Sequence, residues 1–109
     1  KMKGTHLGEF EEIVLLVVGI LNDDAYSISI KKMIREKTGR VPSIGALHSA
    51  LNRLEKKSFL ESYEGGSTRE RGGRRKRFYH ITSQGKSALT HSFVLRSSLY
   101  HLVPDLKSI

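Results

Sequence analysis

The sequence predicts a mainly helical fold of the α+β class with one small β-hairpin. Apolar residues recur every three or four positions over residues 9–57 and again after residue 82, which is the period of an α-helix. Over residues 59–81 the period falls to two on either side of a glycine- and arginine-rich stretch, as in a hairpin. A chain of 109 residues is one domain with an appended helix, and we expect the division to fall between residues 1–82 and 83–109.

The charge of the chain points to a polyanionic partner. It has 19 lysines and arginines against 11 acidic residues, a net charge of +8, which favours nucleic acid or an anionic membrane surface. Cysteine is absent, which excludes disulfides and thiolate metal sites. The longest apolar run, residues 13–21, is too short to span a bilayer, and no export signal is visible. We therefore expect a cytoplasmic protein without a membrane partner.

The first helix is predicted from Glu9 and is apolar all round. One stripe comprises Phe10, Ile13, Val14, Val17, Val18 and Leu21, while Leu15, Leu16 and Ile20 fill the other side. A helix of this kind must be covered on two sides. In so short a chain one side is expected to face its own core and the other a second subunit.

Two further helices with a tight connection are predicted next. Asp24 is the expected N-cap of the first, and Gly39 the left-handed residue that ends it. Its core-facing side is expected to comprise Tyr26, Ile30, Met33, Ile34 and Lys37. Ser43 is the expected N-cap of the second helix, whose apolar stripe comprises Ile44, Leu47, Leu51 and Leu54.

The opposite face of that second helix suits a major groove. It is small at its start and polar or basic afterwards, and comprises Gly45, Ala46, His48, Ser49, Asn52, Arg53 and Lys56. Such a face can approach DNA closely and reach base edges or phosphates. Taken alone, the pattern also fits an ordinary amphipathic helix with a solvated face.

A basic β-hairpin is predicted to follow. Its strands run from Phe59 to Glu64 and from Arg77 to Ile81, and residues 65–75 between them contain four glycines and no apolar side chain. Six basic residues crowd this end of the hairpin, namely Arg69, Arg71, Arg74, Arg75, Lys76 and Arg77. A charge run can simply be solvated, but like charges this dense repel unless phosphates neutralise them. A basic hairpin directly after a helix-turn-helix is a wing.

The last predicted helix begins after its N-cap, Thr82, and carries a broad apolar face. That face comprises Leu95, Leu99, Leu102 and Leu106, with Leu89, Phe93, Tyr100 and Val103 on a neighbouring strip. Pro104 should end or kink the helix near residues 101–103. We expect the first helix, or its copy in a partner subunit, to cover this face. The alternative is a helix folded back on its own domain.

The element order and three stretches of sequence resemble the PadR family of bacterial transcriptional repressors, in its short form with one C-terminal helix. The stretches are LGEFEEIVLL at residues 7–16, LHSALNRLE at residues 47–55 and GRRKRFYHITSQG at residues 73–85. The resemblance implies a winged helix-turn-helix whose terminal helices interlock in a homodimer on a pseudo-palindromic operator. The chain departs from the family pattern at His48, Ser49 and Ser58, where tyrosine, proline and glycine are usual.

These observations give two sets of expected site residues. Those expected to contact double-stranded DNA are Ser43, Gly45, His48, Ser49, Asn52, Arg53, Lys56, Arg69, Arg71, Arg74, Arg75 and Lys76. Those expected at the dimer interface are Phe10, Val14, Val17, Phe93, Leu95, Leu99, Leu102 and Leu106. No cofactor, metal site or catalytic unit is expected, because the five histidines lack metal-ligand spacing and nothing orders a nucleophile.

Two other functions stay open at this point. A winged fold can serve as a protein-interaction module, which would show no salt-dependent retention of DNA. Some members of the family that the chain resembles also bind flat aromatic compounds between the dimer helices. Phe10, Phe93 and Tyr100 could line such an effector site in this chain. The operator, the regulated genes and the identity of any effector cannot be read from the sequence.

Overall fold

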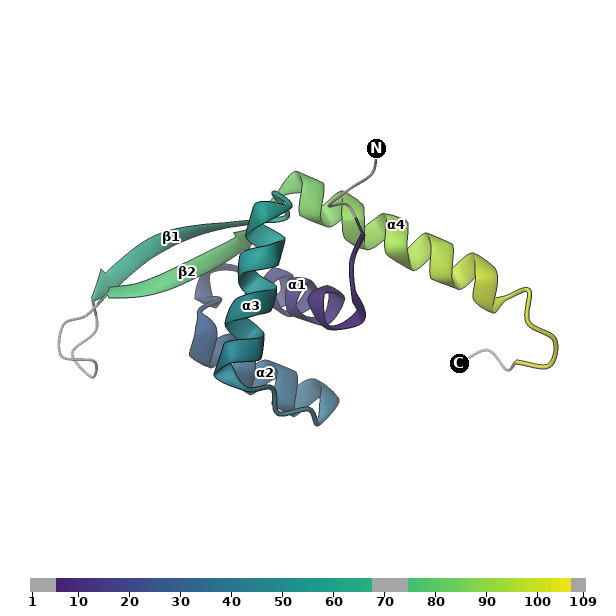
Figure 1. Cartoon of the computed structure of the whole chain (residues 1–109), viewed down its shortest axis with the longest axis horizontal. Coiled ribbons are helices and arrows are strands. Elements are labelled where there is room, and N and C mark those ends of the chain that lie inside the picture. Colours follow the sequence, from purple (N-terminus) through teal and green to yellow (C-terminus); the bar gives the residue numbers. More distant parts are fainter. Residues whose placement is uncertain (1–5, 68–74, 107–109) are drawn as a thin grey trace.

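The computed structural model describes residues 6–67 and 75–106. The chain runs through α1 (Glu9–Leu21), a 3₁₀ turn η1 (Asn22–Asp24), α2 (Ser27–Thr38), α3 (Ile44–Lys56), β1 (Leu60–Ser67), β2 (Arg75–Ile81) and α4 (Ser83–Tyr100) (Figure 1). The predicted α+β class, with its helices and single antiparallel hairpin, is confirmed. α1 lies at the centre, α2 and α3 pack on it, and the hairpin and α4 extend in opposite directions (Figure 1).

One apolar core joins α1, α2, α3 and the base of the hairpin. Its fully buried members include Val14, Leu15, Ile30, Ile34, Leu47, Leu51, Leu54 and Leu60. The stripe predicted on α3 is therefore buried except at its first residue, Ile44, which is exposed. Ile44 lies one turn before the core begins, where no neighbouring helix covers it. Ala50, which the predicted stripe did not include, is buried as well.

A buried carboxylate ties α3 to α1. Glu11, only 5% exposed, accepts a hydrogen bond from the Gly8 N–H at 2.9 Å, from Lys57 Nζ at 2.9 Å and from Arg53 Nε at 2.6 Å. Burial alone would raise the pKa of Glu11, but these hydrogen bonds together outweigh it and lower the pKa from 4.5 to about 2. The carboxylate is thus ionised at neutral pH and clamps the end of α3 against the start of α1.

The predicted caps of α3 and α4 are confirmed, and that of α2 is wrong. Ser43 Oγ accepts from the Ala46 N–H, and Thr82 Oγ1 accepts from the Gly85 N–H, both at 3.0 Å. Asp24 instead closes the 3₁₀ turn, and α2 begins after Tyr26, whose N–H donates to Ser29 Oγ at 3.0 Å. The 3₁₀ turn takes up the residues that would otherwise have started the helix.

The hairpin is anchored to the helical core through its second strand. β1 and β2 pair in register from Leu60 opposite Ile81, with an irregularity after Glu64. The Tyr79 N–H donates to the Ala25 carbonyl at 2.9 Å, which attaches β2 to the segment before α2. The start of α2 and the base of the hairpin therefore form one unit.

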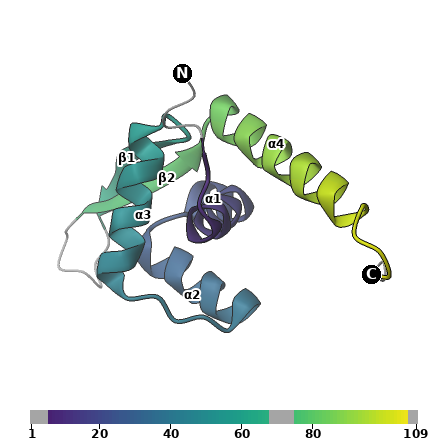
Figure 2. The ribbon, with the colours of Figure 1, turned by 45° about the vertical axis from the view of Figure 1, so that its right-hand side comes forward.

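Helix α4 starts on the core and then leaves it. Leu89 is partly buried against the core, whereas Phe93 is 70% exposed and Leu99 56%. Figure 2 shows the outer half of α4 projecting away from the other helices, so the alternative of a helix folded back on its own domain is wrong. The helix ends at Tyr100, shortly before Pro104 as predicted, so Leu102 and Leu106 lie beyond it and do not continue its stripe.

A tight joint connects the end of α3 with the start of α4. Thr82 Oγ1 donates to the Ser58 carbonyl at 2.6 Å, and the Thr82 N–H donates to the Phe59 carbonyl at 3.1 Å. A Cβ added to Gly85 would lie 2.4 Å from that same Phe59 oxygen, so only glycine fits there. Ser58 holds a left-handed backbone with φ of 67°, at the position where a glycine was noted as usual.

Candidate nucleic-acid interface

The outward face of α3 is small at its start and polar along its length. Gly45, His48, Ser49 and Asn52 are all exposed. A Cβ added to Gly45 would meet nothing within 4 Å, so packing does not require this glycine. A glycine inside a helix costs about 0.5–1 kcal/mol relative to alanine. A glycine at position 45 would, however, let a partner approach the helix backbone closely.

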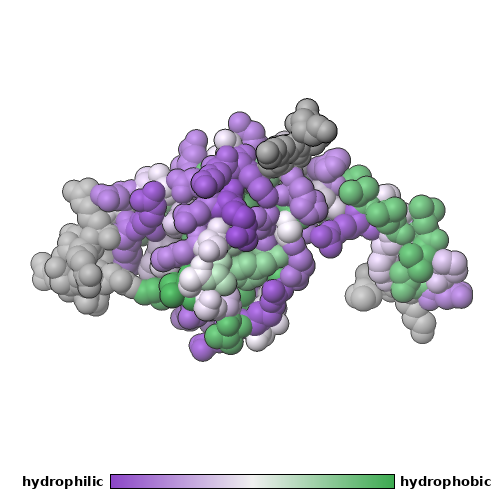
Figure 3. All heavy atoms as spheres, in the orientation of Figure 1, coloured by the Kyte–Doolittle hydropathy of each residue, from purple (hydrophilic) through white to green (hydrophobic). Residues whose placement is uncertain are grey.

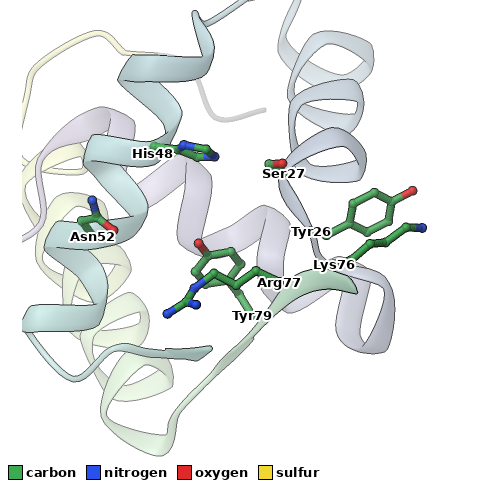
Figure 4. Close-up of a pocket in the computed structure, with 7 residues that line it drawn as sticks. All are labelled: Tyr26, Ser27, His48, Asn52, Lys76, Arg77 and Tyr79. Atoms are coloured by element: carbon green, nitrogen blue, oxygen red, sulfur yellow. The ribbon is translucent and has the colours of Figure 1, made fainter. Parts of the chain in front are cut away.

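Beside this face lies an open hollow of about 400 Å³. Figure 4 shows how three elements meet around it: α3 supplies two side chains, the start of α2 two more, and β2 the other three. The lining residues are Tyr26, Ser27, His48, Asn52, Lys76, Arg77 and Tyr79. The hollow thus brings hydrogen-bonding groups of the helix beside two cations of the hairpin. Cations can contact the phosphates of DNA, and hydrogen-bonding side chains can contact its base edges.

Aromatic rings hold the base of the hairpin in a fixed direction. The Phe78 ring contacts Tyr26 edge-on at 5.5 Å and stacks with Tyr63 at 5.7 Å between centroids. The same ring covers Gly65, where an added Cβ would lie 2.2 Å from it. Lys76 Nζ sits 4.0 Å above the Tyr26 ring, a cation–π contact that places its ammonium at the hollow. These contacts therefore fix the base of the hairpin against the start of α2.

Arg53 differs from the other expected DNA contacts. Its Nε donates to Glu11, which holds the guanidinium toward α1, and Lys57 shares the same carboxylate. Lys56, the last residue of the same helix, is exposed and forms no ion pair within the described residues. The sequence pattern placed both on one face, but it could not show that a buried carboxylate lies within reach of only one of them.

The expected contacts in the hairpin are only partly within the described structure. Arg69, Arg71 and Arg74 lie outside the described residues, and Arg75 is described only as the first residue of β2. Lys76 and Arg77 are described, and both line the hollow.

Sequence reasoning missed four residues of the hollow as site residues. They are Tyr26, Ser27, Arg77 and Tyr79. Arg77 was visible in the basic run, but the others come near α3 only through the attachment of β2 to the start of α2. Burial raises the pKa of the Tyr79 phenol, with Arg77 opposing the shift, so Tyr79 stays neutral and a hydrogen-bond donor at physiological pH.

The expected dimer residues fall into two groups. Val14 and Val17 are buried in the core of their own chain, and Phe10 is partly buried beneath the Arg40 guanidinium, 5.3 Å from its centroid. The residues that α1 leaves exposed are Leu16 and Ile20 instead. On the C-terminal side the expected residues are all exposed, namely Phe93, Leu95, Leu99, Leu102 and Leu106. On α1 the residues available for contact with a second subunit are therefore Leu16 and Ile20, and not the predicted Val14 and Val17.

The described residues lack two other kinds of site. Within the described ranges, no three His, Asp or Glu side chains come together as metal ligands would. None of the helices in this part of the chain is long and apolar enough to cross a membrane. Of the aromatic residues expected around an effector, Phe10 packs on its own core, whereas Phe93 and Tyr100 lie on the exposed part of α4.

Comparison with known proteins decides the family. Residues 14–91 match the family described as Transcriptional regulator PadR-like. The chain belongs to this family. It is therefore a DNA-binding transcriptional regulator and not an enzyme, and the winged helix-turn-helix expected from the sequence is confirmed.

Individual relatives agree with this assignment. An uncharacterised protein of Lysinibacillus sphaericus is 36% identical over 85 residues, covering 76% of this chain and 73% of that protein. The structure of a transcriptional regulator from Clostridium thermocellum is 27% identical, with a TM-score of 0.71 over 98% of this chain and 97% of the other. A PadR family regulator from Clostridium difficile shares the fold at 24% identity, with a TM-score of 0.67 over 86% and 96%.

Proposed function

We propose that this PadR-like regulator is a repressor that binds a pseudo-palindromic operator as a homodimer. Residues 1–82 form the DNA-binding part, and residues 83–109 form the dimerisation part. The observation that carries the proposal is the hollow that His48 and Asn52 of α3 line together with Lys76 and Arg77 of β2. Figure 4 shows the Arg77 guanidinium extending toward the α3 side of this hollow, whereas Lys76 runs along the Tyr26 ring. In this proposal α3 enters the major groove while the hairpin follows the phosphate backbone.

The exposed residues of α3 divide into two roles. Asn52 and Ser49 are the base-reading residues, since an asparagine amide bonds adenine through two hydrogen bonds. His48 and Lys56 contact phosphates, together with Lys76 and the arginines of the hairpin. Ser43 is the N-cap and accepts the Ala46 N–H, and the N–H groups of the first turn that it leaves free would bind a phosphate.

The homodimer follows from the surface that α4 leaves uncovered. Its exposed apolar residues, such as Phe93 at 70% and Leu99 at 56%, lie close together along the helix, and contiguous exposed apolar surface marks sites of protein association. Figure 3 shows these hydrophobic side chains gathered along the outer half of α4. A second copy would cover them with its own α4 and with Leu16 and Ile20 of α1. Two α3 helices would then face one duplex, and the bound dimer would block access to a promoter.

The decisive experiment selects bound sequences from a random duplex pool and then tests two variants on the selected duplex. We expect a palindrome whose half-sites lie about one helical turn, or a multiple of it, apart. Asn52→Ala should cost about 1–3 kcal/mol on the selected duplex and little on mixed DNA. Lys56→Ala is the matched control and should weaken binding to both duplexes equally. Equal losses for Asn52→Ala on both would exclude a base-reading role, and a non-palindromic selection would exclude the dimeric arrangement.

A further inference from the structure

A second hollow lies on the other side of the α3 N-terminus, between α2 and the turn into α3. Its volume is about 440 Å³. The residues that line it are Ile28, Lys31, Lys32, Arg35, Val41 and Ile44. Ile28, Lys31, Lys32 and Arg35 follow helical spacing on one face of α2, while Val41 and Ile44 lie opposite. We call these six residues the α2 surface.

The α2 surface combines exposed aliphatic side chains with unpaired cations. Val41 is 67% exposed, and Ile28 and Ile44 are each 49% exposed. Within residues 6–67 and 75–106, Lys31, Lys32 and Arg35 form no ion pair with a carboxylate. In Figure 3 apolar and hydrophilic side chains lie beside each other at the lower edge of the molecule, over α2 and the turn that follows it.

The turn that presents Val41 is held in place by its neighbours. Gly39 takes a left-handed backbone with φ of 77°, and the Arg40 N–H donates to Thr38 Oγ1 at 3.1 Å. The Arg40 guanidinium is bound to Glu9 at 2.7 Å, so this arginine points toward α1 and away from the hollow. Pro42 fixes its own φ. Because the turn is fixed before any partner arrives, binding there would cost little ordering entropy.

We propose that the α2 surface binds a protein segment in which acidic and aliphatic residues alternate. The three cations would pair with the acidic side chains, and the hollow between the aliphatic walls would take a leucine-like anchor. Duplex DNA would satisfy Lys31, Lys32 and Arg35, but it offers little to three exposed branched aliphatic residues, which gain free energy only when an apolar partner displaces water.

The test uses the full-length protein and two labelled twelve-residue peptides, one alternating Glu and Leu and the other alternating Lys and Leu. We expect fluorescence anisotropy to show saturable binding of the Glu/Leu peptide only. Val41→Ser should weaken that binding about fivefold, the loss expected for one partly buried aliphatic contact, whereas Val41→Leu should retain it. Lys32→Gln combined with Arg35→Gln should weaken it about tenfold, and Lys86→Gln on α4 is the charge control.

The same variants are then measured on a mixed-sequence duplex. The proposal requires Val41→Ser to leave DNA affinity unchanged while it weakens peptide binding. If the Glu/Leu peptide fails to saturate, or if Val41→Ser binds it as well as the parent does, the proposal is overturned. If the peptide fails and Lys32→Gln with Arg35→Gln weakens duplex binding, the surface belongs to the DNA interface instead. Unfolding curves for each variant exclude loss of fold, which is not expected at positions this exposed.

Discussion

Helices α3 and α4 carry leucines at the same helical spacing but bury them differently. In α3, Leu47, Leu51 and Leu54 are completely buried. In α4, Leu95 and Leu99 are 51% and 56% exposed. The spacing therefore predicts a helix with an apolar face in both cases, but it does not tell what covers that face. For α3 the cover is α1, α2 and the hairpin base, whereas the residues that the structure describes leave Phe93, Leu95 and Leu99 of α4 exposed.

The largest expected effect comes from introducing charges into the apolar face of α4. Leu95→Glu combined with Leu99→Glu should raise the dimer dissociation constant at least about a thousandfold, because each buried leucine contributes about 1.5–3 kcal/mol and the change occurs in both subunits. Sedimentation velocity over a range of concentrations measures the shift. Ser87→Glu, at an exposed position near the start of the same helix and away from its outer half, is the matched control and should leave the dimer intact. A double variant that still sediments as a dimer would place the interface elsewhere.

The next effect concerns the buried carboxylate that attaches the end of α3 to the start of α1. Glu11→Gln should lower the free energy of unfolding by about 3 kcal/mol at pH 7, because the pKa of Glu11 is lowered from 4.5 to about 2 on folding. A depressed pKa in the folded state gives a stabilisation that is complete above pH 4.5 and lost as pH falls toward 2. Urea unfolding at pH 7, 4.5 and 2.5 should show this loss in the parent and a flatter profile in the variant.

Glu9→Gln is the control for that experiment. Glu9 pairs with Arg40, but both side chains are largely exposed, so the change should cost less than about 1 kcal/mol. Equal losses for the two variants would mean that the buried carboxylate has no special part in holding α3.

The smallest expected effect concerns Gly45 on the exposed face of α3. Gly45→Ala should stabilise the fold by about 0.5–1 kcal/mol, since a Cβ meets nothing there and alanine favours a helix. The same change should weaken DNA binding about tenfold if the glycine is needed for close approach. Gly19→Ala in α1, where a Cβ also meets nothing within 4 Å, should stabilise equally without affecting DNA. A Gly45→Ala variant with full DNA affinity would remove this glycine from the interface.

Local chemistry explains what the sequence predicted well. The hydroxyls of Ser43 and Thr82 cap their helices because each lies next to the N–H groups that need an acceptor. The hairpin strands and the end of α4 before Pro104 also depend on residues close together in the chain.

What the sequence could not show are the contacts between distant residues. Asp24 had the right chemistry for a cap but lies in a 3₁₀ turn, and Val14 and Val17 face their own core because α2 and α3 pack on that side. Arg53 reaches Glu11 across 42 positions of sequence, and Tyr26 reaches the hollow only through the bridge to Phe78. No periodicity along the chain contains that information.

The joint at Ser58 and Thr82 has a consequence for how a dimer would measure DNA. Because the Thr82 hydroxyl bonds the Ser58 carbonyl and Gly85 packs closely on the Phe59 carbonyl, the first turn of α4 is fixed to the chain just after α3, the helix proposed to enter the major groove. In a dimer, a small change in the angle at which the two α4 helices cross would change the distance between the two α3 helices. The crossing angle of the two α4 helices would then set the distance between the half-sites of the operator, although the helices cross far from any base pair.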